Sequence, residues 1–178
     1  MAAGIAYSAS GVLLSCVDDA DSSVLNIDNE KILISVQNIL FPNDVNGPGA
    51  YDVKAHEYLK WWLTDARIDP DEQQYVRNGL KWVDETAQET HQQHFLKLSK
   101  QQQVDLIYQI SQETWGESWL SVMLTYIFEA MISDPIYGYN QNEIGWSWLN
   151  HQAGVPRPTE ALKYDTIFET IQKNQSNA

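Results

Sequence analysis

Residues 115–133 (WGESWLSVMLTYIFEAMIS) constrain the fold of this chain more than any other segment. Only two of these residues, Glu117 and Glu129, carry a charge, and no proline interrupts the run. A helix this apolar is stable in water only when other elements cover it. We therefore predict that residues 115–133 form a helix at the centre of the core.

Five other segments also carry the signals of helices. Asp69 is a favourable N-cap residue, followed by Pro70 and two acids, and Ser99 with Gln102 makes a capping-box pattern. No run alternates apolar and polar residues for long enough to form a sheet. The predicted helices cover residues 28–40, 51–66, 70–90, 100–112, 115–133 and 159–175. The predicted fold class is all-α, a single domain of about six helices with a long ordered aromatic loop before the last helix.

Apolar side chains within these patterns identify the expected core. In the helix over residues 100–112, we expect four side chains to be buried or partly buried: Val104, Ile107, Tyr108 and Ile110. Tryptophans at helical spacing usually pack in a core, and five fit that description: Trp61, Trp62, Trp82, Trp115 and Trp119. The last helix has an apolar side formed by Leu162, Ile167, Phe168 and Ile171.

Composition excludes several classes of protein. The 178 residues include 24 Asp and Glu against 11 Lys and Arg, a net charge of −13, so phosphate backbones would repel the chain and we expect no nucleic-acid partner. A single cysteine rules out an intramolecular disulfide, a cysteine-based zinc site and an iron–sulfur cluster held by this chain alone. A hydrophobic fraction of 43% with seven tryptophans is enough for a folded core.

Residues 1–17 contain no charged side chain. The segment is short for a membrane-spanning helix, which needs about 20 apolar residues, and it suits the apolar part of a secretory signal. Leu13 lies three residues before Cys16, and a small residue directly precedes that cysteine, as in bacterial lipoprotein signals whose thiol is acylated. We predict a signal-like lipoprotein segment over residues 1–16 with lipidation at Cys16, a polar linker over 17–28, and a helical domain over 29–178.

Residues 1–17 differ from an export signal in one respect, and they also allow a second interpretation. Export signals begin with basic residues, and none precedes the apolar run, so we expect a basic start to be missing from this sequence. Alternatively, residues 1–17 form a buried N-terminal helix in which Cys16 is a small core residue.

The predicted loop over residues 134–158 is the most informative part of the chain. Loops longer than about 12–15 residues are usually functional or disordered. This one is too aromatic for disorder, since it contains Tyr137, Tyr139, Trp146 and Trp148. Gly138 and Gly145 permit backbone angles closed to other residues, and Asn140 can hold a tight turn. We expect the loop to be ordered by packing on its own core or on a partner, and the sequence leaves both open.

No set of residues in the sequence points to catalysis. His91 and His94 have an acceptable spacing for metal ligands, with Glu89 or His151 as a conceivable third, but the sequence favours solvated histidines at a helix end. Ser118 lacks the following glycine of a nucleophile elbow, and the glycines around Pro48 lack the Lys-Ser/Thr of a phosphate-binding loop. We expect no catalytic residue, no resident metal and no cofactor in this chain.

Two blocks of sequence resemble a known family. The first is Ile39-Leu40-Phe41-Pro42 followed by Gly47-Pro48-Gly49-Ala50, and the second is Asp134-Pro135-Ile136-Tyr137-Gly138, then Asn140, then Gly145-Trp146. The chain resembles, over residues 29–148, the gluconate 2-dehydrogenase subunit 3 family of flavin-dependent, membrane-bound sugar and sugar-acid dehydrogenases. Tyr139 stands where the family usually has Gly, and the glycine-rich turn after Gly-Trp is altered here.

The resemblance implies a role without chemistry in this chain. It implies a non-catalytic small subunit that assists folding, assembly and export of a catalytic subunit, which binds FAD and oxidises a sugar, polyol or sugar acid. A third subunit with haem c often passes the electrons to the membrane. The implied location is periplasmic and membrane-associated, here through a lipid anchor. The implied partner contacts or loop anchors are the block residues Pro42, Gly47, Pro48, Gly49, Pro135, Tyr137, Gly138, Asn140, Gly145 and Trp146.

Two other functions stay open at this point. One is a free-standing periplasmic lipoprotein that binds carbohydrate through exposed tryptophans. The other is a metal-dependent enzyme using His91 and His94.

Overall fold

The computed structural model describes residues 25–151, 159 and 163–176. These residues form seven α-helices and no strand, which confirms the all-α prediction. The helices are α1 (Ile27–Leu40), α2 (Ala55–Trp62), α3 (Pro70–His91), α4 (Lys100–Ile110), α5 (Thr114–Ile132), α6 (Ile144–Trp148) and α7 (Tyr164–Ser176). Three 3₁₀ turns connect them: η1 (Phe95–Lys97), η2 (Pro135–Tyr137) and η3 (Gln141–Glu143).

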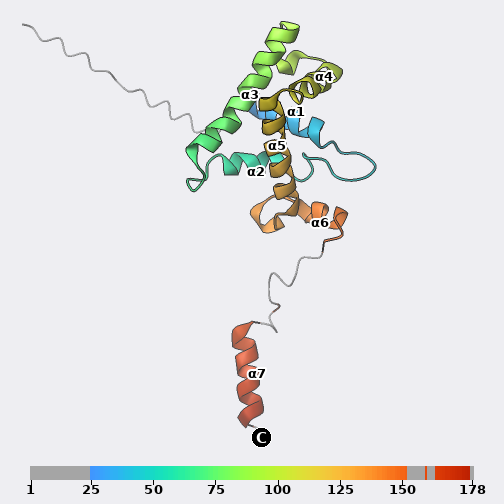
Figure 1. The fold of residues 1–178 in the computed structure, drawn as a ribbon. Helices are drawn as coiled ribbons and strands as arrows, with labels where there is room; N and C mark the ends of the chain where they lie inside the picture. The colour runs from blue at the N-terminus through green and yellow to red at the C-terminus, as the bar shows by residue number, and fades with distance from the viewer. Residues whose placement is uncertain (1–24, 152–158, 160–162, 177–178) are drawn as a thin grey trace, which may run out of the picture.

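Helix α5 lies at the centre of the bundle, as its apolar sequence predicts. It packs against α1, α2, α3 and α6. In Figure 1, the upper part of α5 lies beside α3, and its C-terminal end lies beside α6. Trp119, Met123 and Ile127 on α5 are completely buried. Trp119 and Met123 belong to a large hydrophobic cluster with residues of α1, α2, α3 and α4, and Ile127 belongs to a smaller cluster at the end of α5 beside the loop that follows α1.

The predicted capping residues set the helix starts. The Asp69 carboxylate accepts a 2.9 Å hydrogen bond from the Asp71 amide at the start of α3. Ser99 and Gln102 exchange side-chain and backbone hydrogen bonds as a complete capping box at the start of α4. Such contacts satisfy amide groups that a helix N-terminus leaves without an intrahelical partner, so they fix where each helix begins.

Three predictions about the helices need correction. Val104 and Tyr108 of α4 are exposed, and Leu106 is buried with Ile107 and Ile110, because the buried stripe of α4 runs through positions 103, 106, 107 and 110. The predicted helix over 51–66 is only Ala55–Trp62, since Lys54 adopts a left-handed conformation (φ 58°). The predicted loop after α5 contains a helix, α6.

Some predictions fall on residues outside the described ranges. The signal-like segment and Cys16 lie there, as does Leu162 of the predicted last helix. In α7, the apolar side chains of Ile167, Phe168 and Ile171 are partly exposed.

Candidate functional site

The two sequence blocks of the resemblance, almost a hundred residues apart, meet beside the C-terminal end of α5. The Asn140 amide donates a 3.1 Å hydrogen bond to the carbonyl of Val53, and the Trp148 indole Nε1 donates to the carbonyl of Asn46 at 2.5 Å. The Trp148 ring covers Gly47 so closely that a Cβ there would collide with the indole. Loop 41–54 and segment 134–148 therefore form one structural unit.

Asn140 ties the second block together. Its side chain is completely buried and its backbone is left-handed (φ 45°), a conformation that asparagine tolerates better than most residues. Its Nδ2 donates to the Ser133 carbonyl at 3.1 Å, and its Oδ1 accepts from the Gly145 amide at 2.7 Å. A Cβ at Gly145 would lie 2.5 Å from Met131 Cγ, so only glycine fits beneath Asn140.

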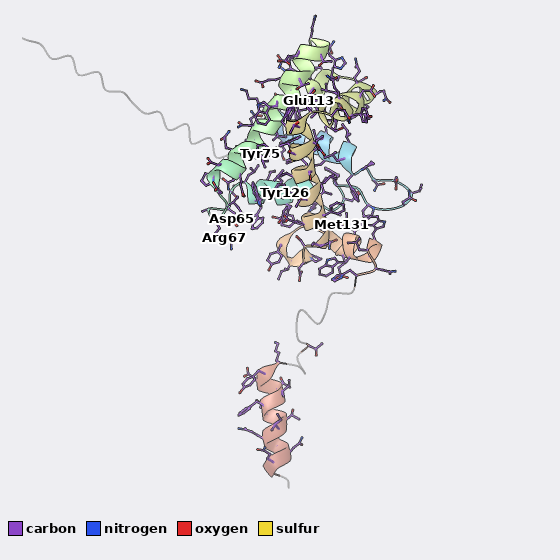
Figure 2. The ribbon with its side chains drawn as sticks, viewed as in Figure 1. Asp65, Arg67, Tyr75, Glu113, Tyr126 and Met131 are labelled. Atoms are coloured by element: carbon purple, nitrogen blue, oxygen red, sulfur yellow. The ribbon has the colours of Figure 1, made fainter. Side chains whose placement is uncertain are left out.

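Trp146 closes the C-terminal end of α5. Its side chain is only 7% exposed, and its Nε1 donates a 2.9 Å hydrogen bond to the carbonyl of Ile132. The last carbonyls of a helix have no intrahelical partner, so this indole caps α5. Figure 2 labels Met131 at this end of α5, next to α6. Trp146 therefore supports the position of α6 from inside the domain.

The first block is held by Asp52. Its carboxylate accepts a 2.8 Å hydrogen bond from the Gly49 amide and a 2.5 Å bond from the Asn43 side chain. A Cβ at Gly49 would collide with the Asn43 backbone, so the chain crosses itself at a glycine. Pro48 is buried in this crossing, whereas Pro42 is exposed.

On the outside of this unit lies a hollow of about 860 Å³. We call it the aromatic hollow, because three large rings line it and are well exposed: Tyr51 (59%), Trp61 (44%) and Tyr137 (72%). Helix α2, with residues of the loop before it and Thr64 after it, forms one wall, and η2 with the start of η3 forms the other. The polar lining includes Asp52, Lys54, Glu57, Lys60, Thr64 and Gln141.

Gly138 shapes the rim of the aromatic hollow. It follows η2 with φ 95°, in the left-handed region that favours glycine, while no atom lies within 4 Å of the place a Cβ would take. The backbone angle, and not a lack of space, is what selects glycine. The turn sends the chain back toward Asn140 and leaves Tyr137 and Ile136 facing outward. Pro135, half-buried, opens η2.

Two ionisable groups of the hollow, His56 and Lys60, show how its lining is organised. His56 is 8% exposed and stacks on Tyr51 with ring centroids 5.1 Å apart, and burial lowers its pKa, so the neutral imidazole is favoured. Lys60 donates a 2.9 Å hydrogen bond to Glu30, which raises the pKa of Lys60. Such a lining favours aromatic and hydrogen-bonded contact over the capture of a small ion.

Two of the histidines considered as metal ligands lie in other contacts. His94 Nδ1 lies 2.8 Å from the Asp84 carboxylate, which also accepts the Phe95 amide at 2.8 Å. His151 instead packs its ring against Trp146. Within the described residues, no group of three or more His, Cys, Asp or Glu is arranged to hold a metal ion.

A model of the gluconate 2-dehydrogenase subunit 3 family matches residues 27–154. The chain belongs to this family. The match confirms the resemblance drawn from the two blocks and covers the whole unit described above. Comparison with curated proteins and comparison with solved structures give no match.

Membership in the gluconate 2-dehydrogenase subunit 3 family makes the chain a subunit of a dehydrogenase complex. Helices long and apolar enough to cross a membrane do not occur within the described ranges. The matched region ends before α7, so α7 lies beyond the part that the family shares.

Of the ten block residues, the structure buries five in the interior of the unit and places two in the lining of the aromatic hollow. Asn140, Gly145 and Trp146 face inward, and Tyr137 with Gly138 faces the hollow. The sequence patterns do not identify Tyr51 as a functional residue, and they place Trp61 in the core with Trp62. Neighbouring residues of a helix point about 100° apart, so α2 buries Trp62 and turns Trp61 outward.

Proposed function

We propose that this chain is the non-catalytic small subunit that assists folding, assembly and export of an FAD-dependent dehydrogenase oxidising a sugar, polyol or sugar acid. We further propose that the catalytic subunit docks on the aromatic hollow. The observation that carries this proposal is the gathering of three exposed rings in one hollow, Tyr51 and Tyr137 from the unit that both family blocks build and Trp61 from the adjoining helix α2.

The energetics of interfaces support docking at this place. Tyrosine and tryptophan dominate interface hot spots, where the loss of one ring commonly costs 2 kcal/mol or more. Tyr51 and Tyr137 stand on loops that Asp52 and Asn140 hold through several hydrogen bonds, and Trp61 stands on helix α2, so the three rings share a rigid wall. A rigid wall loses little conformational entropy on binding, so more of the contact energy appears as affinity.

The absence of catalysis in this chain is part of the proposal. The polar groups of the hollow are engaged in structural contacts: Asp52 holds loop 41–54, Lys60 binds Glu30, and His56 stacks on Tyr51. We propose that FAD resides in the partner subunit and haem c in a third subunit, with no cofactor in this chain.

The location of the complex is part of the same proposal. We propose a periplasmic, membrane-associated complex, with this chain attached through a lipid on Cys16. Stable attachment needs more than one acyl chain, and a mature bacterial lipoprotein carries several.

Co-purification tests the assembly proposal. The full-length chain, tagged at its C-terminus, is expressed in its native host and isolated from mild detergent. The expected result is a stoichiometric flavoprotein in the eluate, with dehydrogenase activity toward dye acceptors and the flavin absorbance bands. The tagged chain alone, expressed without the partner, should show neither. Recovery of the chain without a flavoprotein, or flavin bound to the chain by itself, would overturn the proposal.

Carbohydrate binding by the free chain is a second candidate, favoured by the combination of stacking rings and polar groups in one open hollow. Trp61 and Tyr137 stand beside Thr64 and Gln141 in the lining. Calorimetric titration of the purified chain with glucose and gluconate distinguishes the two. Saturable heat that disappears in Trp61→Ala supports sugar binding, and its absence leaves the subunit role.

A further inference from the structure

Helices α3 and α5 enclose a second groove that shares no lining residue with the aromatic hollow. It consists of two hollows that lie along the two helices. One, of about 470 Å³, is lined by Asp71, Glu72, Tyr75 and Tyr126 among others. The other, of about 380 Å³, is lined by Trp82, Glu85, Thr86, Glu89 and Trp115. Figure 2 labels Tyr75 on α3 and Tyr126 on α5.

The floor of this groove is a row of aromatic rings. Tyr75 meets Trp82 with centroids 6.2 Å apart, and Trp82 meets Trp115 at 5.4 Å, both in edge-to-face geometry. Tyr75, Trp82 and Trp115 are each half-buried, so they contribute to the core and to the surface together. Trp82 and Trp115 therefore pack in the core, as predicted, and also form part of the surface.

Carboxylates stand at both ends of the row. Tyr75, Trp82, Glu85 and Glu89 are three, four or seven positions apart, which puts them on one side of α3. Asp71 and Glu72 occupy the other end. Helix α3 carries five carboxylates against two basic residues. Glu72 also helps to raise the pKa of Tyr126, after burial and Glu129, so its negative charge acts on the groove.

A lysine pairs with one of the carboxylates of this groove. Lys81 lies 3.1 Å from Glu85, four residues further along α3. Both side chains are exposed, and pairs of this kind contribute little stability and exchange readily with other partners. A positive charge therefore sits beside Glu85, while Lys81 does not line the hollow between Trp82 and Trp115.

We propose that the groove between α3 and α5 binds a basic segment of a partner polypeptide, with two arginine side chains in the two hollows. A guanidinium packs on tryptophan and tyrosine faces and donates two parallel hydrogen bonds to a carboxylate. One arginine lies against Trp82 and Trp115 beside Glu85 and Glu89. The second lies against Tyr75 and Tyr126 beside Asp71 and Glu72.

The distance between the hollows sets the spacing of the two arginines. Val76 lines one hollow and Thr86 lines the other, and a rise of 1.5 Å per residue along α3 separates these two residues by about 15 Å. An extended chain advances about 3.3 Å per residue, so about four or five residues span this distance. The proposal therefore specifies an extended segment with arginines at positions i and i+4 or i+5.

This inference goes beyond the proposed function and does not depend on it. The groove would bind a basic segment whether that segment belongs to the flavoprotein or to another polypeptide. Loss of docking at the aromatic hollow leaves the groove unaffected, because no residue lines both sites.

A designed peptide tests the proposal on the full chain. The probe is the blocked peptide acetyl-Arg-Ser-Gly-Ser-Arg-amide, compared with a twin in which neutral citrulline replaces both arginines. Binding is followed by NMR through the indole N–H signals of Trp82 and Trp115, assigned with the variants Trp82→Phe and Trp115→Phe. Both signals should shift with the arginine peptide, which should bind about tenfold or more tightly than its citrulline twin.

Two charge variants separate the groove from the general acidity of the chain. Glu85→Gln/Glu89→Gln should weaken binding of the arginine peptide severalfold. Asp165→Asn/Glu169→Gln, which removes the same charge from α7, should leave it unchanged. All four side chains are exposed, so thermal melts should stay the same. Equal binding of the citrulline twin, equal weakening by the α7 variant, or no shift of either indole would overturn the proposal.

Discussion

The indole ring of Trp119 on α5 rests on Gly79 of α3. Trp119 is completely buried, and its Nε1 donates a 3.2 Å hydrogen bond to the Val76 carbonyl one turn before Gly79. Because Gly79 has no side chain, α3 and α5 can pack closely with the Trp119 ring between them. This contact lies in the large hydrophobic cluster and sets the groove between α3 and α5.

Gly79→Ala should destabilise the fold. Alanine favours a helix over glycine by about 1 kcal/mol, but its Cβ would collide with the Trp119 indole, and overpacking of a core typically costs about 1–3 kcal/mol. We expect a net loss in the free energy of unfolding, measured by urea denaturation. Ser118→Ala, on the exposed side of α5, is the control. A Gly79→Ala protein as stable as the wild type would show that α3 and α5 adjust freely.

Trp146→Ala should unfold the end of the domain more than it weakens the partner surface. Loss of a buried tryptophan costs about 3–5 kcal/mol, and here the α5 cap at Ile132 goes with it. A large drop in Tm is expected by calorimetry. An unchanged melt combined with lost flavoprotein binding would instead place Trp146 in the interface.

His56 should make stability depend on pH. Burial lowers its folded-state pKa below the unfolded value of 6.5, so the unfolded chain binds the proton more readily. Its contribution is therefore fully present above pH 6.5 and is lost as the pH falls from there to the folded pKa. Urea denaturation between pH 7.5 and about 5 should show a shallower loss for His56→Gln than for the wild type. If the free energy of unfolding depended on pH identically in the two proteins, His56 would be charged inside the fold.

Cys16 should be the site of acylation in the exported precursor. Labelled palmitate supplied to cells that make the full-length chain should enter the protein and be lost in Cys16→Ser. Incorporation that survives this substitution, or no incorporation into the unsubstituted chain, would exclude lipidation at Cys16.

Sequence patterns predicted the parts of the fold that depend on local chemistry. The caps at Asp69 and Ser99 and the apolar run of α5 rely on neighbours in the chain, and the structure agrees with them. Helix α6 was missed because five residues do not form a stable helix alone. Its position depends on Trp146 reaching Ile132, a contact between separate elements.

The candidate site was harder to predict for the same physical reason. The family blocks identified the loops, but five of the ten block residues are buried inside the unit and do not face solvent. The rotation of α2 against α5 determines whether Trp61 or Trp62 faces outward. The apolar pattern of α2 does not determine this rotation. Tyr51 faces the hollow only because Lys54 turns the chain before α2 begins.

Affinity for the flavoprotein after removal of the exposed rings tests the central claim most directly. The measurement is the Kd of the full chain for its catalytic subunit, by surface plasmon resonance, for Trp61→Ala and Tyr137→Ala. Each should weaken binding by about thirtyfold, equivalent to about 2 kcal/mol, without changing Tm. The control is Tyr108→Ala on α4, which removes a ring that is similarly exposed (69%) but lies outside the hollow. Unchanged Kd in both hollow variants, or an equal loss in Tyr108→Ala, would contradict the assignment of the aromatic hollow as the docking site.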